Sequence, residues 1–250
     1  MCFELDSAPP IPVISGAAVS HRELELEAAD GNRFAAFAAE PDSPTGACVA
    51  ILPDVRGLYR FYEELALRFA ERGHPAVAID YFGRTAGVGK RDDDFEYMEH
   101  VQQTTPEGIQ ADVRAAVEWL RGEGCRAVFT MGFCFGGHHS WLAAAGGHGL
   151  AGAIGFYGVP GERDGRPGPI QRAGELEAPV LALQAGADAH ISAEANAEFE
   201  QALEAAGVEH DVVTYEGAPH SFFDRKQEDF QDASDDAWNR VLDFITRHAA

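Results

Sequence analysis

The sequence lacks several features that would assign it to a specialised class. No stretch approaches the ~20 consecutive apolar residues of a membrane-spanning helix. The first residues do not combine a basic start with a long apolar run, so no secretory signal is predicted. Cysteine is scarce: Cys2, Cys48, Cys125 and Cys134 form no CxxC pair, and no second ligand lies at a spacing that suits zinc. We therefore expect a cytoplasmic protein with reduced thiols that requires no metal and no cofactor.

Basic residues are also few. The chain has 19 Lys and Arg against 41 Asp and Glu, which gives a formal net charge of −22. A surface of this sign repels nucleic-acid phosphates and anionic membranes, so neither is expected as a partner. A small anionic substrate would need a local positive site. The sequence leaves open whether the chain is a monomer or a homodimer.

What the sequence does contain indicates one large domain. Its 250 residues are 46% hydrophobic and 24% charged, which is ordinary for a globular protein with a substantial core. No internal repeat, low-complexity tract or linker divides the chain. Residues 1–17 are rich in proline and are predicted to form an irregular N-terminal arm, followed by a single domain over residues 18–250.

Strand and helix patterns alternate along that domain. It opens with two apolar-faced segments joined by "DGN", which is typical of a β-hairpin. Short apolar runs then predict six buried strands with helices between them, as in a mostly parallel sheet covered on both faces. In such sheets ligands lie beyond the carboxyl ends of the strands. We expect the six strands at 47–53, 75–81, 127–133, 151–158, 179–186 and 209–217, helices at 60–72, 106–121, 137–145, 192–206 and about 228–248, and a long insertion or short helices at 83–105.

The segment "GFCFGG" (132–137) lies where a predicted strand meets a predicted helix. Its pattern G-x-C-x-G has the form of the nucleophile elbow G-x-S-x-G, with sulfur in place of the hydroxyl. In so tight a turn the positions two before and two after the nucleophile approach closely, and Gly132 and Gly136 meet the need for small residues. The helix that follows would favour the Cys134 thiolate, and the Phe135 N–H would face an oxyanion. The alternative is a buried structural cysteine in a glycine-rich turn.

A cysteine nucleophile needs a base and a group that orients the base. His220 follows a predicted strand, in a loop with glycine and proline, and is our candidate base; alternatively it is a solvated loop histidine. Asp188 follows another buried strand and is our candidate orienting acid. Alternatively, Asp188 caps the helix that begins near Ser192. The order Cys134, Asp188, His220 is the nucleophile, acid, histidine order of α/β-hydrolases.

Five segments carry a family resemblance: "LPDVRGLYRFYEELALRFAERGHPAVAIDYFGRT", "GFCFGG", "GFYG", "GADAHIS" and "GAPHSFFDR". With them the chain resembles the dienelactone hydrolase family, the carboxymethylenebutenolidase-like branch of the α/β-hydrolase fold, from about residue 20 onward. The resemblance implies a single-domain α/β-hydrolase fold with an eight-stranded, mainly parallel sheet flanked by helices on both faces. It also implies a Cys-His-Asp triad that cleaves lactone or ester bonds through a thioester acyl-enzyme.

Carried over to this sequence, the resemblance assigns the nucleophile to Cys134, the base to His220 and the orienting acid to Asp188. It further implies an oxyanion hole formed by two backbone N–H groups. One belongs to Phe135 and the other to Val55, which lies in the loop after the strand at 47–53.

The resemblance also suggests residues around the nucleophile. Asp54 stands where the family's name-giving member has a glutamate that controls the protonation of the cysteine; alternatively this shorter acid bonds its local backbone. Arg84 is the best anchor for a substrate carboxylate, unless it pairs with one of the surplus acids. Tyr81, Phe222 and Phe223 are candidate pocket walls, although one of the two phenylalanines is expected to pack into the core.

Two other functions fit the same sequence. The first is a carboxylesterase or thioesterase of broad specificity on the same fold. The second is a non-catalytic binder of small molecules, because a fold does not fix a function. Thiol redox chemistry is not expected, since Cys125 precedes the strand that Cys134 follows and so lies at the opposite edge of the sheet. The expected partner is a small ester or lactone, including one that bears a carboxylate.

Overall fold

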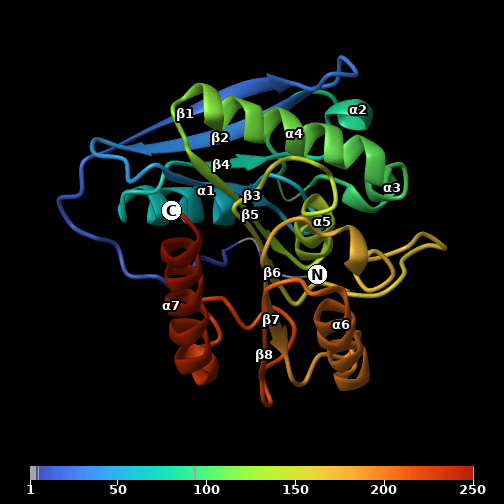
Figure 1. Ribbon diagram of the computed structural model, residues 1–250. Helices are drawn as coiled ribbons and strands as arrows, with labels where there is room; N and C mark the ends of the chain where they lie inside the picture. The colour runs from blue at the N-terminus through green and yellow to red at the C-terminus, as the bar shows by residue number, and fades with distance from the viewer. Residues whose placement is uncertain (1–3, 5, 93, 250) are drawn as a thin grey trace.

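The central element of the protein is an eight-stranded sheet. The structure is a computed structural model and describes residues 4, 6–92 and 94–249. The strands are β1 Val19–Glu27, β2 Arg33–Pro41, β3 Ala47–Leu52, β4 Ala76–Ile79, β5 Ala127–Phe133, β6 Gly152–Phe156, β7 Val180–Ala185 and β8 His210–Tyr215. Their spatial order is β1-β2-β4-β3-β5-β6-β7-β8 (Figure 1). β1 pairs with β2, and β2 with β4, in antiparallel orientation, whereas the other neighbours are parallel.

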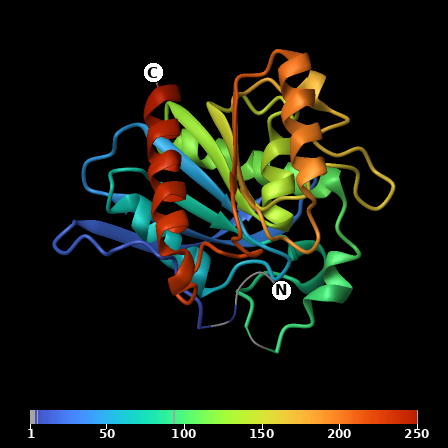
Figure 2. The same cartoon turned by 90° about the horizontal axis from the view of Figure 1, so that it is seen from below.

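Helices cover both faces of the sheet because successive strand residues point apolar side chains to opposite sides. The helices are α1 Arg60–Ala70, α2 Gly83–Ala86, α3 Tyr97–Val101, α4 Pro106–Gly122, α5 Phe135–Ala143, α6 Ala193–Ala206 and α7 Gln231–His248, with 3-10 turns η1 Ala173–Glu175 and η2 Glu228–Phe230. α1 and α7 bury their apolar stripes against the face that carries Val49 and Ile51. α4, α5 and α6 cover the other face. Figure 2 shows α7 and α6 on opposite sides of the sheet.

The expectation of a mostly parallel α/β sheet flanked by helices is confirmed. Helix α4 follows the predicted apolar face, with Ile109, Val113 and Leu120 buried, and Thr105 caps it by accepting a hydrogen bond from the Gly108 N–H. Helix α5 begins at Phe135, earlier than the predicted residue 137, because the helix starts directly after the Cys134 turn. The insertion at 83–105 contains the two short helices α2 and α3.

The N-terminal arm packs against the domain. Its described residues, 4 and 6–17, contain neither helix nor strand, yet residues 7–11 are buried. Ile11 belongs to the core cluster under α1 and α7. Composition alone indicated irregular structure here, and the burial depends on contacts with residues more than 200 positions away.

A disulfide joins Cys48 on β3 to Cys125, which precedes β5, with 5.9 Å between their Cα atoms. The expectation of reduced thiols is therefore wrong for these two residues. β3 and β5 are parallel neighbours, with Cys48 opposite Val128, so the sheet brings together cysteines that are 77 residues apart. The bond lies at the amino end of β5, opposite the edge where Cys134 follows that strand.

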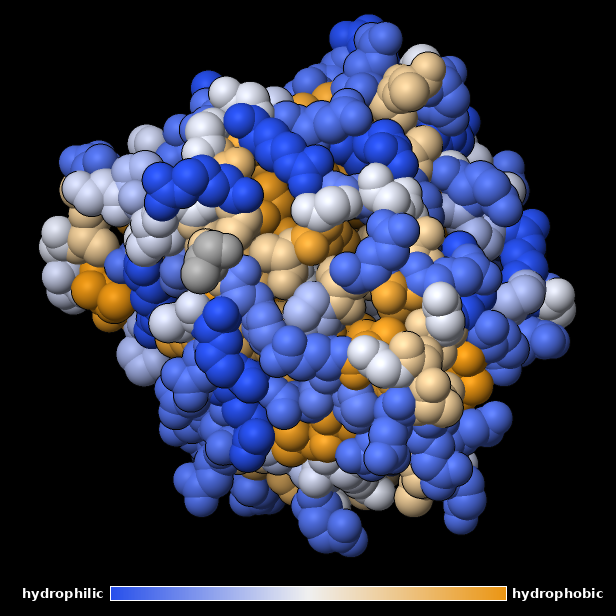
Figure 3. Space-filling view, in the orientation of Figure 1, coloured by the Kyte–Doolittle hydropathy of each residue, from blue (hydrophilic) through white to orange (hydrophobic). Residues whose placement is uncertain are grey.

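The surface is strongly polar, in keeping with the net charge of −22. The face shown in Figure 3 is mainly hydrophilic, with apolar residues gathered near its centre. Within the described ranges no helix is both long and apolar enough to cross a membrane. Among the residues that the structure describes, the large apolar side chains that are exposed lie in the arm and in the insertion at 83–105: Val13, Ile14, Val88 and Met98.

Removal of the Cys48–Cys125 disulfide should cause a measurable loss of stability. It closes a loop of 77 residues, and a native disulfide typically contributes about 2–4 kcal/mol by restricting the unfolded chain. We expect the double variant Cys48→Ala/Cys125→Ala to lose about this much free energy of unfolding in urea titrations. Any activity that depends on Cys134 should stay unchanged, because the bond lies at the far edge of the sheet. An unchanged urea midpoint in the variant would contradict the stabilising role of the Cys48–Cys125 bond. Finding four reactive thiols in the wild type, unfolded without a reducing agent, would show that the bond is absent.

Candidate active site

Cys134 occupies the turn between β5 and α5. Its backbone is left-handed, with φ 53° and ψ −109°, a strained conformation for a residue other than glycine. A Cβ atom at Gly132 would lie 2.0 Å from the Gly136 carbonyl oxygen, and one at Gly136 would lie 2.1 Å from the Leu52 carbonyl oxygen. Both positions therefore admit only glycine, and the packing rationale for "GFCFGG" is confirmed.

The structure also shows what surrounds this cysteine. Cys134 is outside the disulfide and is partly exposed, unlike the fully buried Cys48. Its N–H donates to the Phe156 carbonyl oxygen at 2.9 Å, which ties the turn to the end of β6. The thiol sits at the amino end of α5, where the helix dipole favours a negative charge. A buried structural cysteine is therefore not the arrangement observed.

Asp188 and His220 form the second part of the site, from the loops after β7 and β8. Asp188 Oδ2 accepts a hydrogen bond from His220 Nδ1 at 2.5 Å. Its Oδ1 accepts from the N–H groups of His190 at 2.8 Å and Ile191 at 3.3 Å. Burial raises the pKa of Asp188, but these hydrogen bonds, above all that of His220, lower it below its ordinary value. Ser192, and not Asp188, caps α6, by accepting from the Ala195 N–H.

His220 lies between Asp188 and Cys134. Burial alone lowers its pKa, but hydrogen bonds to Asp188 and to the Cys134 side chain outweigh burial and raise the pKa to about 9. The Tyr157 ring lies 4.8 Å away and the His190 ring 6.4 Å away, measured between centroids. Three side chains from three different loops thus meet at the carboxyl edge of the sheet, where the sequence placed them.

The loop after β3 borders this site. The carboxylate of Asp54 is fully buried and accepts hydrogen bonds from the Arg56 side chain and N–H and from the Tyr59 hydroxyl. The Asp54 N–H in turn donates to the Tyr62 hydroxyl at 2.8 Å. These contacts match the alternative that Asp54 hydrogen-bonds within its own loop. Among the described residues, no acceptor takes up the Val55 N–H.

The other predicted site residues make structural contacts. Arg84 pairs with Asp112 at 2.5 Å and with Asp30 at 2.7 Å, which is the ion-pair alternative. Tyr81 is buried and donates to the Pro53 carbonyl oxygen at 2.9 Å, so it supports the loop after β3. Phe222 and Phe223 are both fully buried in the core, whereas only one was expected there. All three aromatic side chains support the site from beneath.

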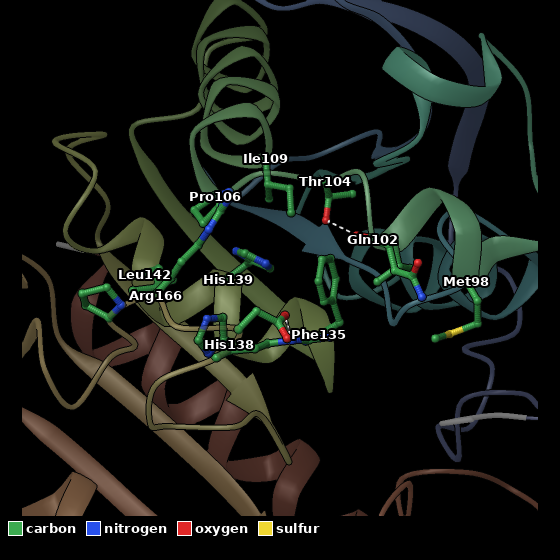
Figure 4. A pocket seen from close by; sticks show the side chains of 14 residues that line it. Met98, Gln102, Thr104, Pro106, Ile109, Phe135, His138, His139, Leu142 and Arg166 are labelled. Atoms are coloured by element: carbon green, nitrogen blue, oxygen red, sulfur yellow. Dashed lines mark hydrogen bonds and ion pairs between the residues drawn. The ribbon is translucent and has the colours of Figure 1, made fainter.

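A cleft of about 440 Å³ opens beside α5 and is here called the Phe135 cleft. In Figure 4 the side chains of Phe135, His138 and His139 project from α5 into the space between Ile109 and Arg166. Fourteen residues from α3, α4, α5 and the β6–β7 connection line it: Met98, Val101, Gln102, Thr104, Pro106, Ile109, Phe135, His138, His139, Leu142, Arg163, Asp164, Arg166 and Pro167.

Two of the polar residues that line the Phe135 cleft are arginines, and each makes a long ion pair. Arg163 lies over the Phe135 ring at 4.8 Å, and its nearest carboxylate, Asp164, is 3.5 Å away. Arg166 is 3.9 Å from Glu107. Burial lowers the pKa of His138 to about 4 and that of His139 well below its ordinary value, so both rings are neutral at pH 7.

Sequence reasoning missed this cleft. The segment "GERDGRPG" (161–168) follows a strand at the functional edge, and that position was the available signal. Across the described residues, no group of three or more His, Cys, Asp and Glu side chains is placed to hold a metal ion.

The fold and the site define the class of protein. An elbow cysteine after β5, an acid after β7 and a histidine after β8, on a mostly parallel sheet, are the arrangement of the α/β-hydrolase fold. The family model of the dienelactone hydrolase family matches residues 34–249. The chain therefore belongs to the dienelactone hydrolase family and is a hydrolase.

Individual relatives agree with this assignment. A Yersinia pestis protein assigned as a carboxymethylenebutenolidase is 29% identical over 87% of this chain and 85% of its own. The carboxymethylenebutenolidase of Rhodococcus opacus is 27% identical over 99% of this chain and 97% of its own. Among solved structures, a Klebsiella pneumoniae protein assigned as a dienelactone hydrolase superposes with a TM-score of 0.80 at 25% identity, covering 92% of this chain and 99% of that one.

Removal of the Asp188 carboxylate should change the pKa of His220. Asp188→Asn removes the carboxylate that holds a proton on His220, so the His220 pKa should fall from about 9 toward its ordinary value of 6.5. NMR titration of the histidine ring protons measures this shift. Because the folded-state pKa is raised, the stabilisation by the pair is complete below pH ~6.5 and is lost as the pH rises through about 9. Asp211→Asn, at an exposed ion pair on β8, serves as the control and should leave the titration unchanged.

Proposed function

We propose that this protein hydrolyses lactone or activated carboxylic ester bonds through a Cys134-His220-Asp188 triad and a thioester acyl-enzyme. The observation that carries the proposal is the hydrogen-bonded series from Asp188 through His220 to the side chain of Cys134. A solvated loop histidine would not lie between a buried carboxylate and a partly exposed thiol.

The geometry supports the following reaction. With the His220 pKa near 9, the imidazole holds a proton at neutral pH, and this positive charge together with the amino end of α5 favours the thiolate of Cys134. The sulfur attacks the carbonyl carbon, and the oxygen takes the electron pair of the double bond. The N–H groups of Phe135 and Val55 would stabilise this oxyanion, each by about 3 kcal/mol. Collapse of the intermediate expels the alkoxide, which accepts the proton from His220.

Deacylation reverses the roles of the same groups. Neutral His220 removes a proton from water, and the hydroxide attacks the thioester carbonyl. The carboxylic acid product forms, and the Cys134 thiolate leaves with the electron pair of the broken C–S bond. Asp188 holds the imidazole orientation throughout. A thiolate favours substrates with good leaving groups, such as enol lactones, and the names of the Yersinia and Rhodococcus relatives agree with this class.

The Phe135 cleft supports a finer proposal about the substrate. Its walls combine apolar and polar side chains, and the two arginines that line it make only long ion pairs, at 3.5 Å with Asp164 and 3.9 Å with Glu107. Phe135 follows the nucleophile directly, so a group attached to the reacting carbonyl can extend over its ring into the cleft. We infer that Arg163 and Arg166, in place of Arg84, bind the carboxylate of an ester or lactone with an apolar body.

Removing the nucleophile tests the reaction. We expect Cys134→Ala to hydrolyse a p-nitrophenyl ester only at the rate of the buffer, with an unchanged circular dichroism spectrum and melting temperature. In the wild type, acid quenching and mass spectrometry should reveal an acyl group on Cys134, and iodoacetamide should inactivate at neutral pH. Wild-type turnover by the variant would refute the triad. A wild type that is inactive and reacts slowly with iodoacetamide would favour the non-catalytic binder. A preference for simple esters over enol lactones would favour the broad-specificity esterase.

Charge selectivity tests the cleft. We expect Arg163→Gln/Arg166→Gln to lower kcat/KM at least 10-fold for an activated ester bearing a carboxylate, and far less for its neutral analogue, because charge-assisted hydrogen bonds are lost. The matched control is Arg172→Gln, on the same β6–β7 connection but paired with Glu175 and outside the cleft. An equal fall for both substrates would show that the arginines do not select charge.

A further inference from the structure

The loop that carries His220 contains no helix or strand. β8 ends at Tyr215 and η2 begins at Glu228, so residues 216–227 depend on other contacts for their shape. Ser221, next to the histidine, has a left-handed backbone with φ 68°. Such a backbone is strained in a residue other than glycine and persists only where surrounding contacts hold it. Two of these contacts are the buried rings of Phe222 and Phe223.

The next contact comes from the N-terminal arm. Asp224 is 5% exposed, and its Oδ2 accepts a hydrogen bond from the Ser7 hydroxyl at 2.6 Å. Its Oδ1 accepts from the N–H groups of Ala8 at 3.4 Å and Lys226 at 3.1 Å. The Arg225 N–H returns a hydrogen bond to the Ala8 carbonyl oxygen at 3.0 Å. The arm and the histidine loop are therefore joined in both directions.

The arm is itself anchored on either side of this contact. Ile11 packs in the core, and the Ile14 N–H donates to Glu71 at 3.0 Å at the end of α1. The Gln231 side chain, at the first residue of α7, donates to the Pro10 carbonyl oxygen at 3.4 Å. In Figure 2 the N-terminal arm passes close to the start of α7. The arm thus resists the displacement of the loop that it holds.

We propose that residues 7–11 act as a strap that positions His220, with Asp224 as the positioning residue and Ser7 as its hydrogen-bond partner. The proposal rests on the triad function proposed above for His220. The imidazole faces Cys134, Asp188, His190 and Tyr157, whereas Ser7 bonds to Asp224 further along the loop. The strap therefore acts through the four-residue path from His220 to Asp224.

Its importance follows from the geometry of the triad. The Asp188–His220 hydrogen bond is 2.5 Å long, and a loop that loosens by a fraction of an ångström would lengthen it. Displacement of a catalytic group by about 1 Å can cost a factor of ~100 in rate. Without the Ser7 hydroxyl, the buried Asp224 carboxylate keeps only backbone donors, so an opened loop in which water solvates the carboxylate becomes more favourable.

The first test is Ser7→Ala in the full chain. We expect kcat for a p-nitrophenyl ester to fall about 10-fold with KM within twofold, because the positioning of the base is affected and the binding cleft is not. The His220 pKa, read by NMR titration and from the pH profile of kcat, should fall as its bond to Asp188 lengthens. Ser7→Thr keeps the hydroxyl and should restore both values. Thr45→Ala, which removes a hydroxyl bonded to His74 at the other edge of the sheet, is the matched control.

Asp224→Ala removes the other partner and should reproduce both effects more strongly. A lower melting temperature with an unchanged kcat per folded molecule and an unchanged His220 pKa, in either variant, would reduce the strap to a structural contact and overturn the proposal. The NMR titration does not depend on turnover. If Cys134→Ala shows that the triad function is wrong, the shift of the His220 pKa in Ser7→Ala still decides whether the arm positions this loop.

Discussion

At the turn that carries Cys134, backbone segments approach one another so closely that no side chain fits between them. The rest of the site depends on this close packing. Gly132 packs against the Gly136 carbonyl, and Gly136 packs against the carbonyls of Leu52 and Pro53. The first contact holds Cys134 at the amino end of α5. The second places the loop after β3, with Val55, beside the same turn. The thiol and the N–H groups of the proposed oxyanion hole are thus positioned by one packing arrangement.

Charge is distributed unevenly in this acidic protein. Three of its buried carboxylates are paired with arginines, which offsets the cost of removing a charge from water. The pairs hold the loops at the carboxyl edge: Asp54 with Arg56, Asp80 with Arg91, and Asp112 with Arg84. Arg163 and Arg166 differ because their nearest carboxylates stand 3.5 and 3.9 Å away. In a chain with 19 basic residues and 41 acidic ones, these two arginines line the same cleft.

The two edges of the sheet are stabilised in different ways. At the amino edge a covalent bond between Cys48 and Cys125 joins neighbouring strands. At the carboxyl edge the connections after β3, β5, β7 and β8 converge, and hydrogen bonds and buried aromatic rings hold them. The arm adds contacts from the beginning of the chain to the loop near its end, between Ser7 and Asp224.

The sequence by itself indicated the succession of strands along the chain and the elbow at Cys134, and it placed Asp188 and His220 directly after later strands. These features are local: apolar runs form strands, glycines at fixed offsets permit the turn, and residues directly after parallel strands must share one edge. Tertiary structure decided the rest. The Cys48–Cys125 bond, the pairing of Arg84 with Asp112, the burial of both Phe222 and Phe223 and the arm under the histidine loop all join distant positions. No local pattern specifies such contacts, because each exists only once the packed sheet has brought its two partners together.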